Sequence, residues 1–364
     1  MAEAHTVNVQ QCTHITEAYI IMYHLKIIKM MKSITSTGII AATAAALLLL
    51  AGCEKESNNV VENGPVAAHI HSVIDPLTDG PGSSGGSDGT TTTRAAGTAW
   101  AKNDAIGITA THTDGTKLLE NAHYLTPGGD GTFTAEDGSV FYFTDNAEVG
   151  FTAYYPYAKP EDFSKDPEVK DGITLILNTD NVQPELQPEF DFLFATATGS
   201  AASPDVRLQF RHCMSRVVLR FLPGEGIAAL DDIRYTLDGM ILRGTFNTRT
   251  GEAKAISVTD AQSIPNSFTL TVPGNGAAEL SSPLILFPQQ GDDVRTLTLT
   301  MRGTKYTATF QLPQNPQNNS VRGLLAGHSY TYNVRINNTT MTITPATISN
   351  WEEGGSENID STNN

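Results

Sequence analysis

The sequence predicts an all-β protein built from two tandem β-sandwich domains, and three features indicate this class. Apolar residues recur at every second position in many short stretches, which is the period of a half-buried strand. No stretch keeps the 3.6-residue period of an amphipathic helix. The chain has 364 residues with a low charged content of 17% and 31 glycines. At roughly 100 to 200 residues per domain, two domains are expected.

The net charge and the cysteine content argue against two classes of protein. The 23 basic and 39 acidic residues give a net charge of −16, so the chain lacks the cationic surface that neutralises phosphates, and we expect no nucleic-acid partner. There are only 3 cysteines. A disulfide-stapled miniprotein is therefore excluded, and stability must come from packing.

An export signal is expected near the N-terminus. The apolar run 39–51 carries no charge, follows Lys32 and is too short to span a bilayer as a helix. It ends in Leu50-Ala51-Gly52-Cys53, which resembles the lipobox of bacterial lipoproteins. We expect an upstream extension at 1–29, a signal peptide at 30–52 and a lipid, such as palmitate, on Cys53. A buried apolar helix with an incidental cysteine is the alternative.

The mature chain is expected to begin with a polar tether at 53–64. Val66, Ala68, Ile70, Ser72 and Ile74 then share one face of an isolated strand. A segment rich in Gly, Ser, Asp and Thr follows it at 75–97. We expect this segment to be accessible to proteases.

Two sandwiches are expected after the tether. The first spans 65–202 and the second 203–352, with a disordered tail at 353–364. Ile173, Leu175 and Leu177 are assigned to the first domain. In the second, the apolar parity of Leu208 to Met214 changes after Ser215, which predicts a bulge near Ser215 and Arg216. Leu297 to Met301 and Tyr306 to Phe310 are predicted to form a hairpin across Gly303.

Residues that could carry chemistry are few. His69 and His71 share a strand face, but no further ligands cluster near them, so an exposed face is favoured over a metal site. His212 is expected to be buried and bonded to the backbone, and Cys213 to be a half-exposed thiol. Gly80 to Gly85 matches a dinucleotide-binding motif and the overlapping Gly82 to Gly86 matches a nucleophile motif, but a linker rich in glycine and serine produces both matches by chance. We expect no enzyme, no catalytic or metal-ligating residue and no cofactor.

Several motifs together resemble the fimbrillin family, the pilus-subunit lipoproteins of Bacteroidales, in particular its fimbrillin-like branch. Each motif is weak alone, but their order and spacing over roughly residues 50 to 352 are specific. They are Thr93-Arg94-Ala95 with Trp100, Asn103 to Ile108, Phe151 to Tyr157, Asp191 to Ala197, Leu208 to Val217, Gly327 to Tyr332, and Ile348 to Trp351.

The resemblance implies two transthyretin-like β-sandwiches in a surface-exposed lipoprotein of the cell outer membrane, and a place in the fimbrium after processing. In polymerising members an Arg-specific protease cuts behind the first strand, which leaves and is replaced by a strand of another fimbrial subunit. Arg94 and Ala95 match the cleavage site, and Val66, Ala68, Ile70 and Ile74 match the displaced strand. The family points to the final hairpin as donor strand, with candidates Tyr330, Tyr332, Val334, Ile336, Met341 and Ile343.

Three alternatives stay open. Arg94 could be an exposed residue of a flexible linker that no protease cuts, as in anchor subunits that keep their first strand. The chain could be a glycan-binding outer-membrane lipoprotein that does not polymerise, with Tyr154, Tyr155 and Tyr157 as the only clustered aromatic candidates. A secreted hydrolase is disfavoured because no nucleophile or metal constellation is visible. A host protein or glycan is a further expected partner in cell adhesion.

Overall fold

The computed structural model describes residues 64–74, 99–136, 138–165, 169–256, 266–315 and 318–350. These residues form strands and two short 3-10 helices, η1 (Pro160–Asp162) and η3 (Gln187–Glu189). Within the described ranges, no helix is long and apolar enough to cross a membrane. The predicted all-β class is confirmed.

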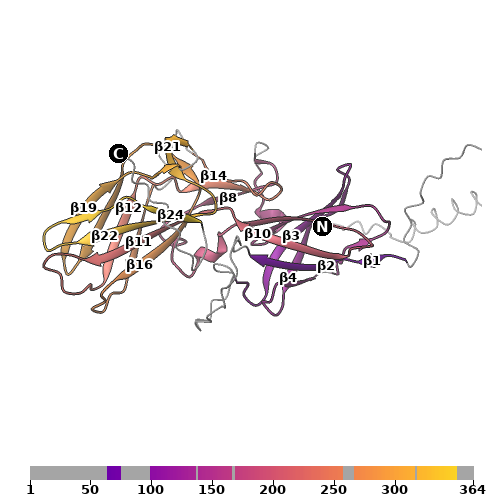
Figure 1. Cartoon of the computed structure of the whole chain (residues 1–364), viewed down its shortest axis with the longest axis horizontal. Coiled ribbons are helices and arrows are strands. Elements are labelled where there is room, and N and C mark those ends of the chain that lie inside the picture. The colour runs from indigo at the N-terminus through magenta and orange to yellow at the C-terminus, as the bar shows by residue number, and fades with distance from the viewer. Residues whose placement is uncertain are drawn as a thin grey trace, which may run out of the picture. The chain divides into compact units, whose positions relative to one another are not determined.

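The first group of strands closes into a barrel in the order β10-β2-β5-β4-β3-β7-β9. Figure 1 labels β2, β3, β4 and β10 of this group. Two short strands, β1 and β6, pair beside it. The bounds are β1 (Val66–Ala67), β2 (His69–Ile74), β3 (Asp104–His112), β4 (Lys117–Thr126), β5 (Thr132–Ala135), β6 (Tyr142–Phe143), β7 (Val149–Tyr155), β9 (Leu193–Gly199) and β10 (Asp205–His212).

The barrel encloses its own hydrophobic core, to which alternate residues of each strand contribute. Ile106, Ile108 and Ala110 of β3 are fully buried, as the period of two requires. At one end, the Trp100 ring packs edge-on against Phe133 and Phe210, with centroids 5.2 Å apart in both pairs. These aromatic contacts add to the area the rings bury.

The remaining strands form four sheets, ordered β16-β11-β22-β23 with β24 also on β22, β15-β12-β18-β19, β14-β13-β8 and β17-β21-β20. They enclose a second hydrophobic core. The bounds are β8 (Gly172–Ile176), β11 (Ser215–Pro223), β12 (Ile233–Asp238), β13 (Arg243–Asn247), β14 (Ala253–Ala255), β15 (Ser267–Val272), β16 (Leu280–Leu286), β17 (Gln289–Gln290), β18 (Arg295–Met301), β19 (Thr304–Phe310), β20 (Gln314–Asn315), β21 (Asn318–Leu324), β22 (His328–Ile336), β23 (Met341–Ile343) and β24 (Thr347–Asn350).

The change of core comes one strand later than the sequence suggests. Strand β10 pairs with β2 and β9, and its inward residues belong to the barrel core, so residues 203–212 do not belong to the second domain as predicted. The phase change near Ser215 and Arg216 is therefore not a bulge. Between β10 and β11 the chain leaves strand structure at Cys213 and Met214 and passes from one sheet to another, so the two parities refer to different cores.

A second correction concerns the segment before β9. Strand β8 pairs with β13, with Ile173 opposite Phe246. Leu177 is completely buried in the second core, and Ile173 and Leu175 pack against that core rather than the first. Alternation showed which side chains are buried but not against which sheet. The predicted hairpin of β18 and β19 is confirmed, with Leu299 opposite Tyr306.

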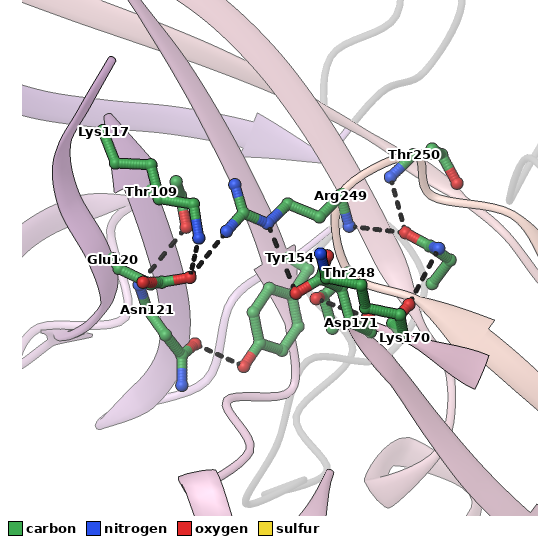
Figure 2. A network of polar contacts seen from close by, with 11 residues as sticks. Thr109, Lys117, Glu120, Asn121, Tyr154, Lys170, Asp171, Thr248, Arg249 and Thr250 are labelled. Carbon is green, nitrogen blue, oxygen red and sulfur yellow. Dashed lines mark hydrogen bonds and ion pairs between the residues drawn. The ribbon is translucent and has the colours of Figure 1, made fainter. Parts of the chain in front are cut away.

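A polar network links β4 of the barrel to the turn after β13 (Figure 2). The Arg249 guanidinium lies between two carboxylates, with Nη2 2.7 Å from Oε1 of Glu120 and Nε 3.8 Å from Oδ1 of Asp171. Glu120 also accepts a hydrogen bond from Lys117. Beneath it, the Tyr154 hydroxyl donates to Oδ1 of Asn121 at 2.7 Å. The network thus joins residues that lie far apart in the sequence.

Candidate functional site

The candidate site is the position of β2 in the barrel wall. Along β2 the exposed fraction alternates strictly, with Ile70 and Ile74 2% exposed and Ser72 8%. Ala68, just before the strand, is also buried, whereas Val66 is only half-buried. The predicted face is confirmed from Ala68 to Ile74, where it belongs to the barrel core, whereas Val66 lies on the separate strand β1.

Two neighbours hold β2 by backbone pairing. Along its whole length it runs parallel to β10, with Ile70 opposite Val206 and Ile74 opposite Phe210. On its other side it is antiparallel to β5 over only two residue pairs, including Ile70 opposite Phe133. Because β2 lies between two strands that are distant in sequence, its removal would open the barrel and leave two unpaired edges.

The groove beneath β2 is apolar. Val206, Leu208 and Phe210 of β10 are each no more than 1% exposed, and Phe133 of β5 is 4% exposed. All of them share the core that receives Ile70 and Ile74. Without a strand over them these side chains would face water. Burial of their apolar surface would therefore favour the binding of another β segment in the same place.

One glycine fits the strand closely. Gly131 precedes β5 with a φ of +80° and accepts a hydrogen bond from the Ser72 amide at 2.8 Å. A Cβ atom at this position would lie 2.2 Å from the Ser72 carbonyl oxygen. Only glycine permits both the left-handed backbone and this approach.

The outer face of β2 is polar and carries an ion pair with its neighbour. His69 Nδ1 lies 3.0 Å from Oδ1 of Asp205 on β10, and both side chains are more than half exposed. Such a solvated pair contributes little to stability. Among the described residues no group of three or more His, Cys, Asp and Glu side chains is arranged to hold a metal ion.

Cys53, Arg94 and Ala95 lie outside the described residues, as does the nucleotide-like pattern from Gly80 to Gly85. The described chain stops at Ile74 and resumes at Ala99. The predicted cleavage site therefore falls within the segment that connects β2 to the rest of the barrel.

The candidate donor residues divide into two groups. Tyr330, Tyr332, Val334 and Ile336 lie on β22 and are at most 1% exposed. Strand β22 pairs with β11 on one side and with β23 and β24 on the other, so it is interior to its sheet. Met341 and Ile343 lie on the three-residue strand β23, which pairs with β22.

The three tyrosines considered as a glycan-binding surface pack against other residues. Tyr154 and Tyr155 are 3% and 2% exposed, and Tyr157 stacks on His123 with a centroid distance of 4.1 Å. No exposed aromatic platform is formed by these three rings. Burial raises the pKa of Tyr154 well above its ordinary value, so its hydroxyl serves as a hydrogen-bonding group.

Two predictions at the end of β10 need correction. His212 is buried as expected, but its Nδ1 pairs with Oδ1 of Asp191 at 3.0 Å rather than with the backbone alone. Cys213 is fully buried, not half-exposed, because it lies where the chain enters the second core. The contact with Asp191 was not predicted, because 21 residues separate it from His212 and Asp191 stands beside an apolar run.

The comparisons with known proteins agree with this architecture. A model of the fimbrillin-like family matches residues 93–351. The chain belongs to the fimbrillin-like family. This confirms the resemblance recognised in the sequence, and the match includes the residues around Arg94 and most of both cores.

Relatives of this fimbrillin-like chain include a protein named "Putative fimbrium subunit Fim1C" from Bacteroides uniformis. It is 24% identical over 320 residues, which cover 85% of this chain and 93% of the relative. A crystal structure named as a "putative cell adhesion protein" from Bacteroides ovatus is 28% identical, with a TM-score of 0.62. The match covers 80% of this chain and 99% of that one.

A second crystal structure under the same description comes from Bacteroides uniformis. It is 20% identical, has a TM-score of 0.57 and matches 80% of this fimbrillin-like chain and 99% of its own. At this identity the likeness concerns the fold alone.

Proposed function

We propose that this protein is a fimbrial subunit that supports cell adhesion and is carried as a lipoprotein on the outer membrane through Cys53. Three findings support the fimbrial and adhesive role, and the lipobox-like sequence before Cys53 supports the anchor. The chain belongs to the fimbrillin-like family, a relative matched over 93% of its length is named a fimbrium subunit, and a similar solved structure is named a cell adhesion protein.

The proposed assembly step is exchange of the first strand. The proposal rests on the position of β2, which lies between β10 and β5 with one face toward the barrel core. The segment that connects β2 to β3 contains Arg94. Cleavage after Arg94 would leave β1 and β2 held by packing and backbone pairing alone. A strand from another subunit would then fill the same groove by β-augmentation.

The hydrophobic free energy that holds β2 in the barrel follows from its buried isoleucines. Burial of an isoleucine side chain contributes about 1.5 to 3 kcal/mol, so Ile70 and Ile74 together contribute about 3 to 6 kcal/mol. Spontaneous loss of the strand is therefore rare. A donor with equivalent apolar residues recovers the same energy, so exchange is close to neutral once the covalent link is cut.

The proposed donor lies in the final strands. Withdrawal of β22 would expose four side chains from the second core, including Tyr330 and Tyr332, and would break pairing on both sides. Release of Met341 and Ile343 on β23 costs much less because β23 contributes only three residue pairs. We therefore propose that donation starts from β23 and the chain that follows it.

The test is limited proteolysis of the purified chain without its lipid, using an Arg-specific protease. We expect a new N-terminus at Ala95 and multimers that resist SDS. The Arg94→Ala variant should stay uncut at this site and remain monomeric. A cleanly cut product that remains a folded monomer would contradict self-assembly and would instead support an anchor or glycan-binding role.

A further inference from the structure

One position on the buried face of β2 is polar. Ser72 lies between Ile70 and Ile74 on this face and is 8% exposed. Opposite it on β10 is Leu208, which is 1% exposed. These three neighbours all belong to the barrel core. The Ser72 hydroxyl is therefore buried among apolar side chains, where only a hydrogen bond offsets the loss of its contact with water.

The hydroxyl has no such bond. Among the described residues, Ser72 Oγ has no hydrogen-bond partner. The ring of Trp100 lies beside Gly131, which is bonded to Ser72, and the buried Nε1 of Trp100 also has no partner. This donor therefore does not reach the hydroxyl. An unpaired buried hydroxyl destabilises the state that contains it. The resident strand thus carries an unfavourable group on the face that holds it in the barrel.

Other buried hydroxyls of this protein are paired. In the same barrel, Thr126 at the end of β4 is completely buried, and its Oγ1 donates to Oδ1 of Asp130 at 3.3 Å. In the second core, Ser282 is 3% exposed and its Oγ lies 2.8 Å from the hydroxyl oxygen of Tyr235. These side chains have the hydrogen bonds that Ser72 lacks, so its hydroxyl is not a general feature of the cores.

The backbone of Ser72 is held independently of its side chain. Its amide donates to the Gly131 carbonyl oxygen at 2.8 Å, and a Cβ atom at Gly131 would lie 2.2 Å from the Ser72 carbonyl oxygen. Any strand that takes the place of β2 can repeat this contact with a residue other than proline. The side chain at this position is therefore what distinguishes one occupant of the groove from another.

We propose that the groove favours a strand of a second copy with an apolar residue in the place of Ser72, and that Ser72 makes the resident strand the weaker occupant. This inference rests on the proposed strand exchange. The candidate donor residues on β22 and β23 meet the requirement, since all are apolar or aromatic, among them Val334 and Met341. Exchange is then favourable, because the incoming strand buries no unpaired hydroxyl.

Two variants of the uncut full chain test the effect of the hydroxyl. Ser72→Ala and Thr126→Val each remove a buried hydroxyl from the same barrel. At a fixed urea concentration within the transition, Ser72→Ala should lower the ratio of unfolded to folded protein about tenfold. Thr126→Val should raise this ratio, because it breaks a hydrogen bond. Circular dichroism measures both. A ratio that is unchanged or raised by Ser72→Ala overturns the proposal.

Competition between peptides tests the preference of the groove. The full chain without its lipid is cut with an Arg-specific protease and mixed with two labelled peptides of residues 66–74, one native and one with Ser72→Ala. At equilibrium, size-exclusion chromatography and mass spectrometry should show about tenfold more of the Ser72→Ala peptide in the barrel. Equal uptake, or more of the native peptide, overturns the proposal. Uptake of neither peptide contradicts strand exchange itself, and the uncut Ser72→Ala variant then decides the role of Ser72.

Discussion

At the scale of single residues, Cys213 shows how burial controls the reactivity of a thiol. The thiol of Cys213 lies inside the second core and next to the Asp191–His212 pair, whose side chains are 4% exposed. Burial, as the largest cause, raises the pKa of Cys213 to about 12. Arg211 lowers the pKa and Asp191 raises it, but both effects are smaller. The thiolate is therefore almost absent at neutral pH, and the residue acts as a core side chain.

The thiol should therefore be inert in the folded protein. In the chain with Cys12→Ser and Cys53→Ser, we expect an aromatic disulfide reagent at pH 8 to label Cys213 only after addition of urea. The physical reason is that both the low thiolate fraction and the lack of access oppose reaction. Labelling at the same rate with and without urea would contradict this prediction.

At the scale of the element, β2 combines a face that binds the barrel with one that does not. Ile70 is 2% exposed and Val73 is 59% exposed on the same strand. The parallel ladder to β10 and the short ladder to β5 hold the backbone, but the buried face supplies the hydrophobic energy. Removal of apolar atoms from the two faces should therefore have very different effects.

Ile70→Ala should lower the free energy of unfolding by about 2 to 4 kcal/mol, whereas Val73→Ala should change it by less than about 0.5 kcal/mol. Urea denaturation of the uncut chain measures both. After cleavage at Arg94, the Ile70→Ala peptide should also dissociate faster, as followed by size-exclusion chromatography. Equal effects of the two substitutions would show that the strand is held by its backbone alone.

The contact between β4 and the turn after β13 is expected to contribute measurably to the stability of the fold. A hydrogen bond from Lys117, assisted by the charge of Arg249, holds the pKa of Glu120 below its ordinary value of 4.5. The ionised form is thus favoured by folding. The associated stability is present above the ordinary value and is lost as pH falls through the lowered pKa.

Glu120→Gln should therefore destabilise the protein at pH 7 by at most about 1 kcal/mol, because the carboxylate is largely solvated. The difference from the parent chain should shrink as the pH is lowered below 4. Thermal unfolding at several pH values measures it, with Glu148→Gln, another exposed glutamate, as control. A difference that grows in acid would contradict the assigned role of the carboxylate.

At the scale of the whole molecule, the chain combines a barrel that contains the proposed displaced strand β2 with a second core that contains the candidate donor residues. The connection between them is short, because β10 ends at His212 and β11 begins at Ser215. The segment around β8 precedes β9 in the sequence but belongs to the second core. The two cores are thus interleaved along the chain, and cleavage at Arg94 would separate only β1 and β2 from them.

The proposed lipid anchor gives a prediction at this scale. Cys53→Ser removes the thiol that would carry the acyl group, so we expect the protein to leave the membrane fraction of the producing cells. Ser57→Ala, in the same tether, should leave the distribution unchanged. Fractionation and immunoblotting of membrane, soluble and sheared-filament pools provide the measurement. Unchanged membrane partition of the Cys53→Ser variant would contradict the anchor.

The fold and part of the site could be predicted because their signals are local. The alternation from Val66 to Ile74 identified the buried face of β2, and the short Gly303 turn identified the hairpin of β18 and β19. The position of β10 could not be predicted, because its inward residues look the same whichever sheet receives them. The unpaired hydroxyl of Ser72 was also invisible, since the groups that could bond it come from other strands.

The amino-acid sequence by itself determined the β class, the inward face of the first strand and membership of the fimbrillin-like family. These depend on residue periodicity and on the order of short motifs. Both are properties of the sequence that do not depend on how distant segments pair. Only the tertiary structure decided that β2 lies between β10 and β5, that β8 joins the second core and that β22 is interior. Strand pairing between distant segments depends on which edges and apolar faces meet in space, and a local pattern does not encode that choice.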